Sequence, residues 1–206
     1  MADYKDYGFT TGAPAHTFGY LLRPLLSLLD KRKNKLILDL GCGNGFLANY
    51  LVKQGYNVYG TDASEEGIAI AKQENPDRFY VQDLSTGKLP AELQALQFDT
   101  ILSTEVIEHL YDPAGFIDFC KGLLPKGGEL IISTPYHGYL KNLSLSMLDK
   151  WDSHHSPAWH GGHIKFWSKK TLSKLLADKG FEVVTFKGCG RMPYFWKSML
   201  VKAKLS

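Results

Sequence analysis

Short apolar runs alternate with amphipathic segments from residue 35 to residue 134, and this rhythm constrains the fold more than any other feature of the chain. Several runs have the length and composition of strands, over residues 35–40, 57–62, 78–83, 98–104 and 128–134. Segments with helical periodicity separate or follow them, over residues 45–55, 64–74, 113–124 and 168–179. Strands that alternate with helices form a parallel sheet, because each connection crosses a face of the sheet before the next strand begins. The sequence therefore predicts an α/β fold with helices on both faces.

Two further apolar segments, residues 181–188 and 197–205, follow the last predicted helix. We expect them to close the sheet as an antiparallel pair. The complete prediction is a Rossmann-like, seven-stranded, mostly parallel sheet with an antiparallel final strand. Because chains divide into separate cores only beyond roughly 250–300 residues, we expect residues 1–206 to form a single domain.

Two long segments do not follow the strand and helix rhythm. Residues 1–34 are predicted to form an N-terminal helical cap, with a helix over about 18–29. Residues 135–167 form an insertion after the fifth predicted strand. Long excursions from a compact α/β domain usually carry function, so we expect the insertion to be a substrate lid.

Charge, hydropathy and cysteine content exclude several classes of partner. Lys and Arg number 24 against 21 Asp and Glu, so no strong basic field predicts a nucleic-acid partner. The most lipophilic stretch, residues 20–29, is interrupted by Arg23 and Pro24 and is shorter than the roughly 20 residues of a membrane span. We therefore expect no stable membrane insertion. The chain has three cysteines without C-x-x-C spacing, which indicates a reducing, cytoplasmic compartment. Oligomeric state is not indicated.

The motif LDLGCGNGF places Gly41, Gly43 and Gly45 where the first strand turns into the first helix. Glycines at this turn let the backbone approach a ligand closely. The dinucleotide fingerprint G-x-G-x-x-G requires a third glycine where this chain has Phe46. This departure disfavours a nicotinamide-dependent reductase, which is kept as the alternative enzyme class.

Two acidic residues follow the same edge of the predicted sheet. Asp62 ends the second strand, 21 residues after Gly41, where a carboxylate can accept both hydroxyls of a ribose. Asp83 ends the third strand and is positioned to accept a hydrogen bond from an adenine amino group. Together they indicate an adenosine-like ligand.

Five motifs occur in order and at the usual spacing of a known family: LDLGCGNGFLA, GTDAS, QDL, FDTILSTEVIEHL and LLPKGGELIISTP. From about Leu36 to Thr134 the chain thus resembles the class I S-adenosylmethionine-dependent methyltransferases. The resemblance implies S-adenosylmethionine as cofactor, with the glycine turn against its methionine part and Asp39 near its ammonium group. The cofactor-binding residues that the resemblance implies are Asp39, Gly41, Cys42, Gly43, Asp62, Ala63, Asp83, Leu84 and Thr104.

Within that family, the motif EVIEHL is similar to the ubiquinone-biosynthesis O-methyltransferases. On a helix, Glu105, Glu108 and His109 would share one face, at positions i, i+3 and i+4. In the quinone-pathway enzymes the matching residues are assigned to a magnesium ion. Magnesium prefers shells made only of oxygen, however, and these side chains can equally serve helix packing or the cofactor pocket. We therefore assign no metal site and keep magnesium as an alternative.

The segment WDSHHSPAWHGGHIKFW, residues 151–167, contains four of the seven histidines of the chain. A zinc site of His160, His163 and one neighbouring histidine is disfavoured, because no regular spacing organises these side chains. Imidazole rings that titrate near neutral pH and large aromatic surfaces suit an acceptor-binding lid. We therefore expect the acceptor to contact His154, His155, Trp159, His160 and His163.

The sequence predicts an enzyme that methylates a small-molecule acceptor, most plausibly at a phenol-like or quinol-like hydroxyl. A hydroxyl nucleophile needs a base, and the candidates are His137, just past the fifth strand, its rival His109, and Glu105. Methylation of nucleobase amines is disfavoured, because the enzymes that perform it usually have an Asn or Asp followed by two prolines and an aromatic residue where this chain has STEV. A non-catalytic subunit that binds S-adenosylmethionine is the alternative outside enzymes.

Overall fold

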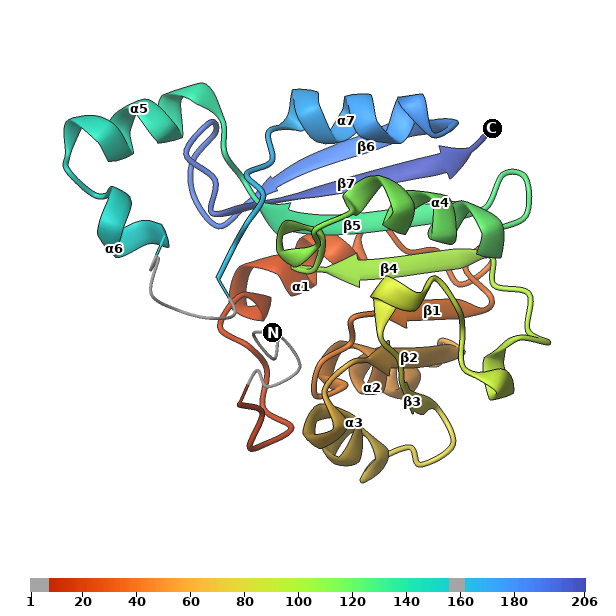
Figure 1. Ribbon diagram of the computed structural model, residues 1–206. Helices are drawn as coiled ribbons and strands as arrows, with labels where there is room; N and C mark the ends of the chain where they lie inside the picture. Colours follow the sequence, from red (N-terminus) through yellow and green to blue (C-terminus); the bar gives the residue numbers. More distant parts are fainter. Residues whose placement is uncertain (1–7, 156–161) are drawn as a thin grey trace.

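Residues 8–155 and 162–206 are described by the computed structural model (Figure 1), in which the strands form one seven-stranded sheet. The strand order is β3-β2-β1-β4-β5-β7-β6. Strands β1 to β5 are parallel to one another, and β7 lies antiparallel between β5 and β6. The predicted fold class is confirmed. The strands are β1 (Ile37–Leu40), β2 (Val58–Asp62), β3 (Phe79–Val81), β4 (Thr100–Thr104), β5 (Glu129–Pro135), β6 (Phe181–Cys189) and β7 (Ser198–Leu205).

Helices cover both faces of the sheet (Figure 1). One apolar cluster packs α4 and α7 against the sheet, and a second packs α1, α2 and α3 against the other face. Ser168 begins α7 with a reciprocal capping box, in which its hydroxyl accepts from the Thr171 N–H. The helices are α1 (Phe18–Leu26), α2 (Phe46–Lys53), α3 (Glu65–Lys72), α4 (Pro113–Leu123), α5 (Tyr139–Met147), α6 (Trp151–His155) and α7 (Lys169–Asp178).

The strand order reverses between β1 and β4, because β1 pairs with β2 on one side and with β4 on the other. Parallel sheets of this kind bind ligands at such a switch point, beyond the carboxyl ends of the strands. Three short 3₁₀ turns follow β3 and β4, at Leu84–Thr86, Ala91–Leu93 and Ile107–His109. Among the described helices, none combines the length and the apolar character needed to cross a membrane.

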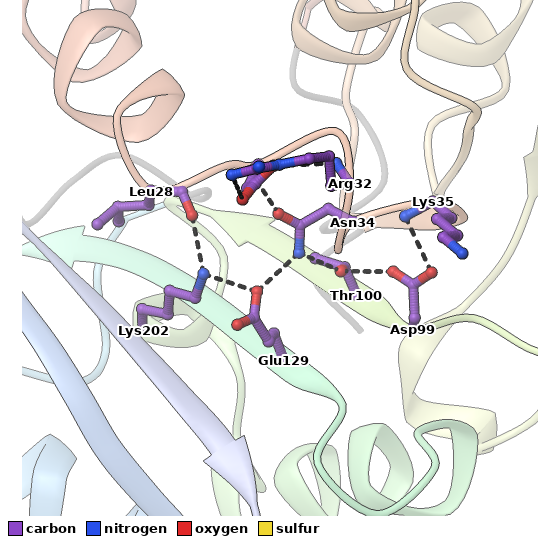
Figure 2. Close-up of polar contacts among 9 residues, drawn as sticks. Leu28, Arg32, Asn34, Lys35, Asp99, Thr100, Glu129 and Lys202 are labelled. Atoms are coloured by element: carbon purple, nitrogen blue, oxygen red, sulfur yellow. Dashed lines mark hydrogen bonds and ion pairs between the residues drawn. The ribbon is translucent and has the colours of Figure 1, made fainter.

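A buried polar network fastens the loop after α1 to the amino ends of β4 and β5 (Figure 2). Lys202 Nζ lies 2.6 Å from Glu129 Oε2 and donates to the Leu28 carbonyl at 2.8 Å. Asn34 Nδ2 contacts both Glu129 Oε2 and Thr100 Oγ1 at 2.7 Å. These interactions pair the buried charged groups of the network within the chain, and we call this end of the sheet the closed end in that sense.

Candidate active site

A cavity of about 610 Å³ opens at the carboxyl ends of the central strands. Its wall includes the glycine turn after β1, the end of β2, the turn after β3 and the residues after β4. Eight of the nine residues expected to bind the cofactor line it: Gly41, Cys42, Gly43, Asp62, Ala63, Asp83, Leu84 and Thr104. The ninth, Asp39, lies buried within β1.

The turn after β1 needs glycine for two reasons. Gly41 and Gly43 have φ values of 78° and 55°, in the left-handed region that other residues avoid. A Cβ atom at Gly41 would also collide with the Val106 side chain. The Gly43 N–H donates to Asp62 Oδ2 at 2.8 Å, so the carboxylate at the end of β2 holds the turn in place. The Ser64 N–H donates to Asp62 Oδ1 at 2.9 Å.

Asp39 is a completely buried carboxylate whose two oxygens accept no hydrogen bond from any described residue. Burial, with a smaller contribution from the charge of Asp62, raises the pKa of Asp39 to about 7. An ionised carboxylate without a partner is costly in such a place. The site therefore fits a ligand that brings a cation, and the ammonium group of S-adenosylmethionine is such a cation.

The motif EVIEHL does not form the α-helix on which its acidic residues and histidine would share a face. Only a 3₁₀ turn, Ile107–His109, follows β4, and Glu105 has a left-handed φ of 56°. The Glu105 N–H donates to the carbonyl and to the hydroxyl of Ser133 on β5, at 3.1 and 3.0 Å. These bonds to the neighbouring strand turn the chain away from a helical path. Glu105, Glu108 and His109 consequently do not share one helix face.

Glu105 lines the cavity and is held by hydroxyl groups from two strands. Its Oε1 accepts from Ser133 Oγ at 2.8 Å, and its Oε2 accepts from Ser198 Oγ at 3.2 Å. Burial raises the pKa of Glu105 to about 7, although these hydrogen bonds and the nearby Lys141 oppose the shift. A carboxylate with such a pKa can exchange a proton near neutral pH.

The magnesium set of Glu105, Glu108 and His109 does not fit this structure. The Glu105 carboxylate is engaged by two serines. Within residues 8–155 and 162–206, one group of potential metal ligands brings its donor atoms within 4.8 Å of one another, and it consists of Glu108, His109 and His163. Two imidazoles and one carboxylate differ from the oxygen shell that magnesium prefers.

The candidate base His137 is buried and does not line the cavity. Its ring stacks on His155 at 5.5 Å and meets the edge of Phe166 at 5.0 Å. Burial, with smaller contributions from Lys141 and neighbouring histidines, lowers the pKa of His137 to about 3, so the ring is neutral at pH 7. His109, the rival base, lies on the cavity wall.

The lid histidines are separated by the structure. His154 and His155 lie on α6, and burial lowers the pKa of both rings, that of His154 to about 4. His163 packs its ring against His109, with centroids 5.0 Å apart. None of these three lines the cavity. Trp159 and His160 lie outside the described residues.

Sequence reasoning missed the part of the wall that comes from the N-terminal cap and from the residues beside the 3₁₀ turn after β4. Phe9, Ala15, Thr17 and Phe18 line the cavity, although no motif marks them. Tyr111, which is exposed, also lines the cavity, two residues after that 3₁₀ turn. The prediction of an N-terminal helical cap over residues 1–34 was the one feature of the sequence that could have indicated these lining residues.

The sequence model of the methyltransferase domain family matches residues 15–185. A ubiquinone biosynthesis O-methyltransferase of Dinoroseobacter shibae is 33% identical over 161 residues, which cover 76% of this chain and 63% of that relative. A ubiquinone biosynthesis O-methyltransferase of Cereibacter sphaeroides is 30% identical over 82% of this chain and 69% of the relative.

Solved structures have the same fold. The magnesium protoporphyrin IX methyltransferase of Synechocystis PCC 6803, with bound SAH, superposes with a TM-score of 0.68 at 23% identity, over 90% of this chain and 82% of that one. An S-adenosylmethionine-dependent methyltransferase of Mesorhizobium loti superposes with a TM-score of 0.65 at 20% identity, over 88% of this chain and 96% of that one.

Proposed function

Because this chain belongs to the methyltransferase domain family, we propose that it transfers a methyl group from S-adenosylmethionine to a hydroxyl of a small, phenol-like or quinol-like acceptor. The relatives from Dinoroseobacter and Cereibacter are O-methyltransferases by name, which supports an oxygen acceptor. The observation that carries the proposal is the position of Glu105, a carboxylate on the cavity wall with a pKa of about 7. Cytoplasmic residence is part of the proposal, and the three buried free cysteines support it.

We assign cofactor binding to the part of the cavity that is formed by the ends of β1 and β2. The turn at Gly41 and Gly43 would present backbone to the methionine part, and the Asp39 carboxylate, which has no hydrogen-bond partner among the described residues, would pair with its ammonium group. Asp62 would accept from the ribose hydroxyls while it also holds the turn. When bound, the cofactor supplies a methyl group already activated by a sulfonium.

The chemical step needs a base and the exclusion of water. In an in-line displacement, the acceptor oxygen bonds to the methyl carbon as the bond between carbon and sulfur breaks, and the hydroxyl proton passes to Glu105. Ser133 and Ser198 hold both carboxylate oxygens by hydrogen bonds. The carboxylate is therefore oriented before the acceptor arrives, which lowers the entropic cost of the step.

The test is transfer of labelled methyl to catechols and other phenols by the full chain, compared between wild type and Glu105→Gln. We expect the variant to lose roughly 10²–10⁴-fold in kcat, the usual contribution of a positioned base. Affinity for the demethylated cofactor should stay within about threefold, since glutamine retains the contacts to the serines. Transfer at the wild-type rate by Glu105→Gln would remove Glu105 as the base. Cofactor binding without turnover of any acceptor would favour the non-catalytic subunit.

The nicotinamide-dependent reductase is not favoured. Phe46 occupies the position where the dinucleotide fingerprint needs glycine, and its ring packs 5.1 Å from that of Phe18 on α1. Competition between S-adenosylhomocysteine and NADH for the purified protein tests this directly. We expect S-adenosylhomocysteine to bind and NADH to leave its binding unchanged.

A further inference from the structure

The segment that leads into α1, residues 8–17, forms part of the wall of the cavity, and we call it the N-terminal strap (red in Figure 1). It contains neither helix nor strand, and residues 10–16 are exposed to solvent. Three of its side chains line the same cavity as the glycine turn after β1: Phe9, Ala15 and Thr17. The strap therefore lies beside the place assigned to the cofactor.

Asn44, in the glycine turn after β1, fastens the strap through its side-chain amide. Its Nδ2 group donates to the carbonyl of Thr11 and to the carbonyl of Ala13, both at 2.8 Å. A side-chain amide has two N–H donors, so both are used on the strap. Its Oδ1 accepts from the Phe46 N–H at 3.3 Å, where α2 begins. One side chain thus joins the strap to the turn that is expected to lie against the methionine part of the cofactor.

Phe9 makes a second contact between the strap and the cofactor edge of the sheet. A Cβ atom added at Gly43 would lie 2.8 Å from an atom of the Phe9 ring, and one added at Gly67 would lie 3.1 Å from it. The ring therefore packs into space that these two glycines leave open, between the turn after β1 and the first turn of α3. The strap is thus attached at two points to the elements that would surround the cofactor.

The helix that follows the strap is held much more firmly than the strap itself. Leu21 and Leu25 of α1 are completely buried in the second apolar cluster, and the Phe18 ring packs 5.1 Å from that of Phe46. The strap, in contrast, lies at the surface and buries little of its length. Segments with few buried apolar contacts open at a lower free energy than the core beside them. The strap can therefore leave the cavity while α1 stays packed on the sheet.

We propose that the N-terminal strap closes over bound S-adenosylmethionine and opens for each exchange of the cofactor, and that Asn44 is the positioning residue that holds it closed. Every turnover requires the demethylated product to leave and a new cofactor to enter, and the opening of such lids limits the rate of many enzymes. A closed strap also keeps water from the reacting sulfonium. The inference rests on the assignment of the cofactor to this cavity and is independent of the acceptor and of the base.

The experiment measures the association and dissociation rate constants of S-adenosylhomocysteine on the full chain by surface plasmon resonance, for wild type, Asn44→Ala and Phe9→Ala. A weakened strap is open for a larger fraction of the time, so the ligand both enters and leaves more often. In Asn44→Ala the dissociation rate constant should rise roughly 5–150-fold, which corresponds to the loss of two hydrogen bonds, and the association rate constant should rise as well. Phe9→Ala should change both rate constants in the same direction, although it leaves the glycine turn intact.

His16→Ala is the matched control, because His16 is exposed within the same segment and does not line the cavity. It should keep the wild-type rate constants. If Asn44→Ala raised the dissociation rate constant alone, Asn44 would act by direct contact with the ligand, and the proposal would be overturned. Wild-type rate constants in both Asn44→Ala and Phe9→Ala would overturn it as well, while the cofactor assignment would stand. A wild-type chain that does not bind S-adenosylhomocysteine would overturn both.

Discussion

Buried charge is handled differently at the two ends of the parallel sheet. At the amino ends of β4 and β5, Glu129 pairs with Lys202 at 2.6 Å and also accepts from Asn34 (Figure 2). At the carboxyl ends, the carboxylates of Asp39 and Glu108 are equally buried but have no hydrogen-bond partner among the described residues. The paired and the unpaired carboxylates belong to the same sheet. We therefore attribute the difference to function: one end stabilises the fold, and the other binds ligands.

The closed end makes its polar interactions within the chain, so they add to folding. The open end leaves donors and acceptors unused, which costs folding free energy until a ligand arrives. Buried carboxylates without a partner beside a cavity are therefore candidates for a binding site. The following variants test that distinction, in order of decreasing effect.

Asp62→Ala should have the largest effect, on the open end. The substitution removes the proposed acceptor for the ribose, and it also removes the carboxylate oxygen to which the Gly43 N–H donates. Two hydrogen bonds to a charged group are together worth about 3–6 kcal/mol, so affinity for S-adenosylhomocysteine should fall at least 100-fold by calorimetry. Asp62→Asn is the control, since it can retain one acceptor. A loss below tenfold in the alanine variant would mean that Asp62 does not hold the ligand.

Lys202→Met should damage the closed end without touching the ligand. It leaves Glu129, whose side chain is 8% exposed, without its cation. Breaking one side of a buried ion pair costs about 3–5 kcal/mol, which urea denaturation would report as a lower free energy of unfolding. The double variant with Glu129→Leu should recover much of the loss. If Lys202→Met instead weakened cofactor binding at unchanged stability, the two ends would not be independent.

Asp39→Asn should raise the free energy of unfolding of the ligand-free protein and should lower its affinity for the cofactor. The pKa of Asp39 rises from 3.8 to about 7 on folding, so its contribution to stability is complete below pH 4 and is lost as the pH rises through about 7. Asparagine does not titrate. The stability gained by the variant should therefore be smallest near pH 4 and grow to the order of a few kcal/mol by pH 8.

Denaturation curves of both proteins at pH 4, 6 and 8 give that difference, and S-adenosylmethionine should reverse it at pH 8 by pairing its ammonium group with the wild-type carboxylate. A gain that is the same at every pH would contradict the assignment of the shift to Asp39.

His155→Phe should have the smallest effect. The ring stacks between Trp151, at 4.6 Å, and His137, at 5.5 Å, and its nitrogens accept or donate no hydrogen bond among the described residues. A phenyl ring keeps this packing, so the free energy of unfolding should change by less than about 1.5 kcal/mol. An increase of tenfold in the KM for the acceptor would restore the prediction that His155 binds it.

Local patterns in the sequence were sufficient to predict the strands of the sheet. The apolar runs predicted β1 to β5 to within a few residues, and the helical periodicity over 168–179 predicted α7. Glycine spacing located the turn after β1, because a turn with several residues in the left-handed region favours glycine at those positions. The family resemblance of the motifs implied the cofactor-binding residues, which lie near the carboxyl ends of the parallel strands, where those ends meet at one edge.

The acceptor end was predicted less well. Spacing suggested one helix face for Glu105, Glu108 and His109, but the Glu105 N–H donates to Ser133 on β5, and Glu105 has a left-handed conformation. Such bonds join residues 28 positions apart. No periodicity within a single segment can report them.

The order of apolar and helical segments, together with the glycines and acids at the strand ends, thus determined the fold class and the cofactor edge by itself, because periodicity and strand-end chemistry are local properties. Only the tertiary structure decided which carboxylates stay unpaired and which histidine meets Glu108 and His109. Those outcomes depend on contacts between segments that the sequence separates, such as the docking of residues 162–165 on the turn after β4. The physical reason is that burial and pairing, which set the charge and reactivity of a side chain, belong to the packed molecule.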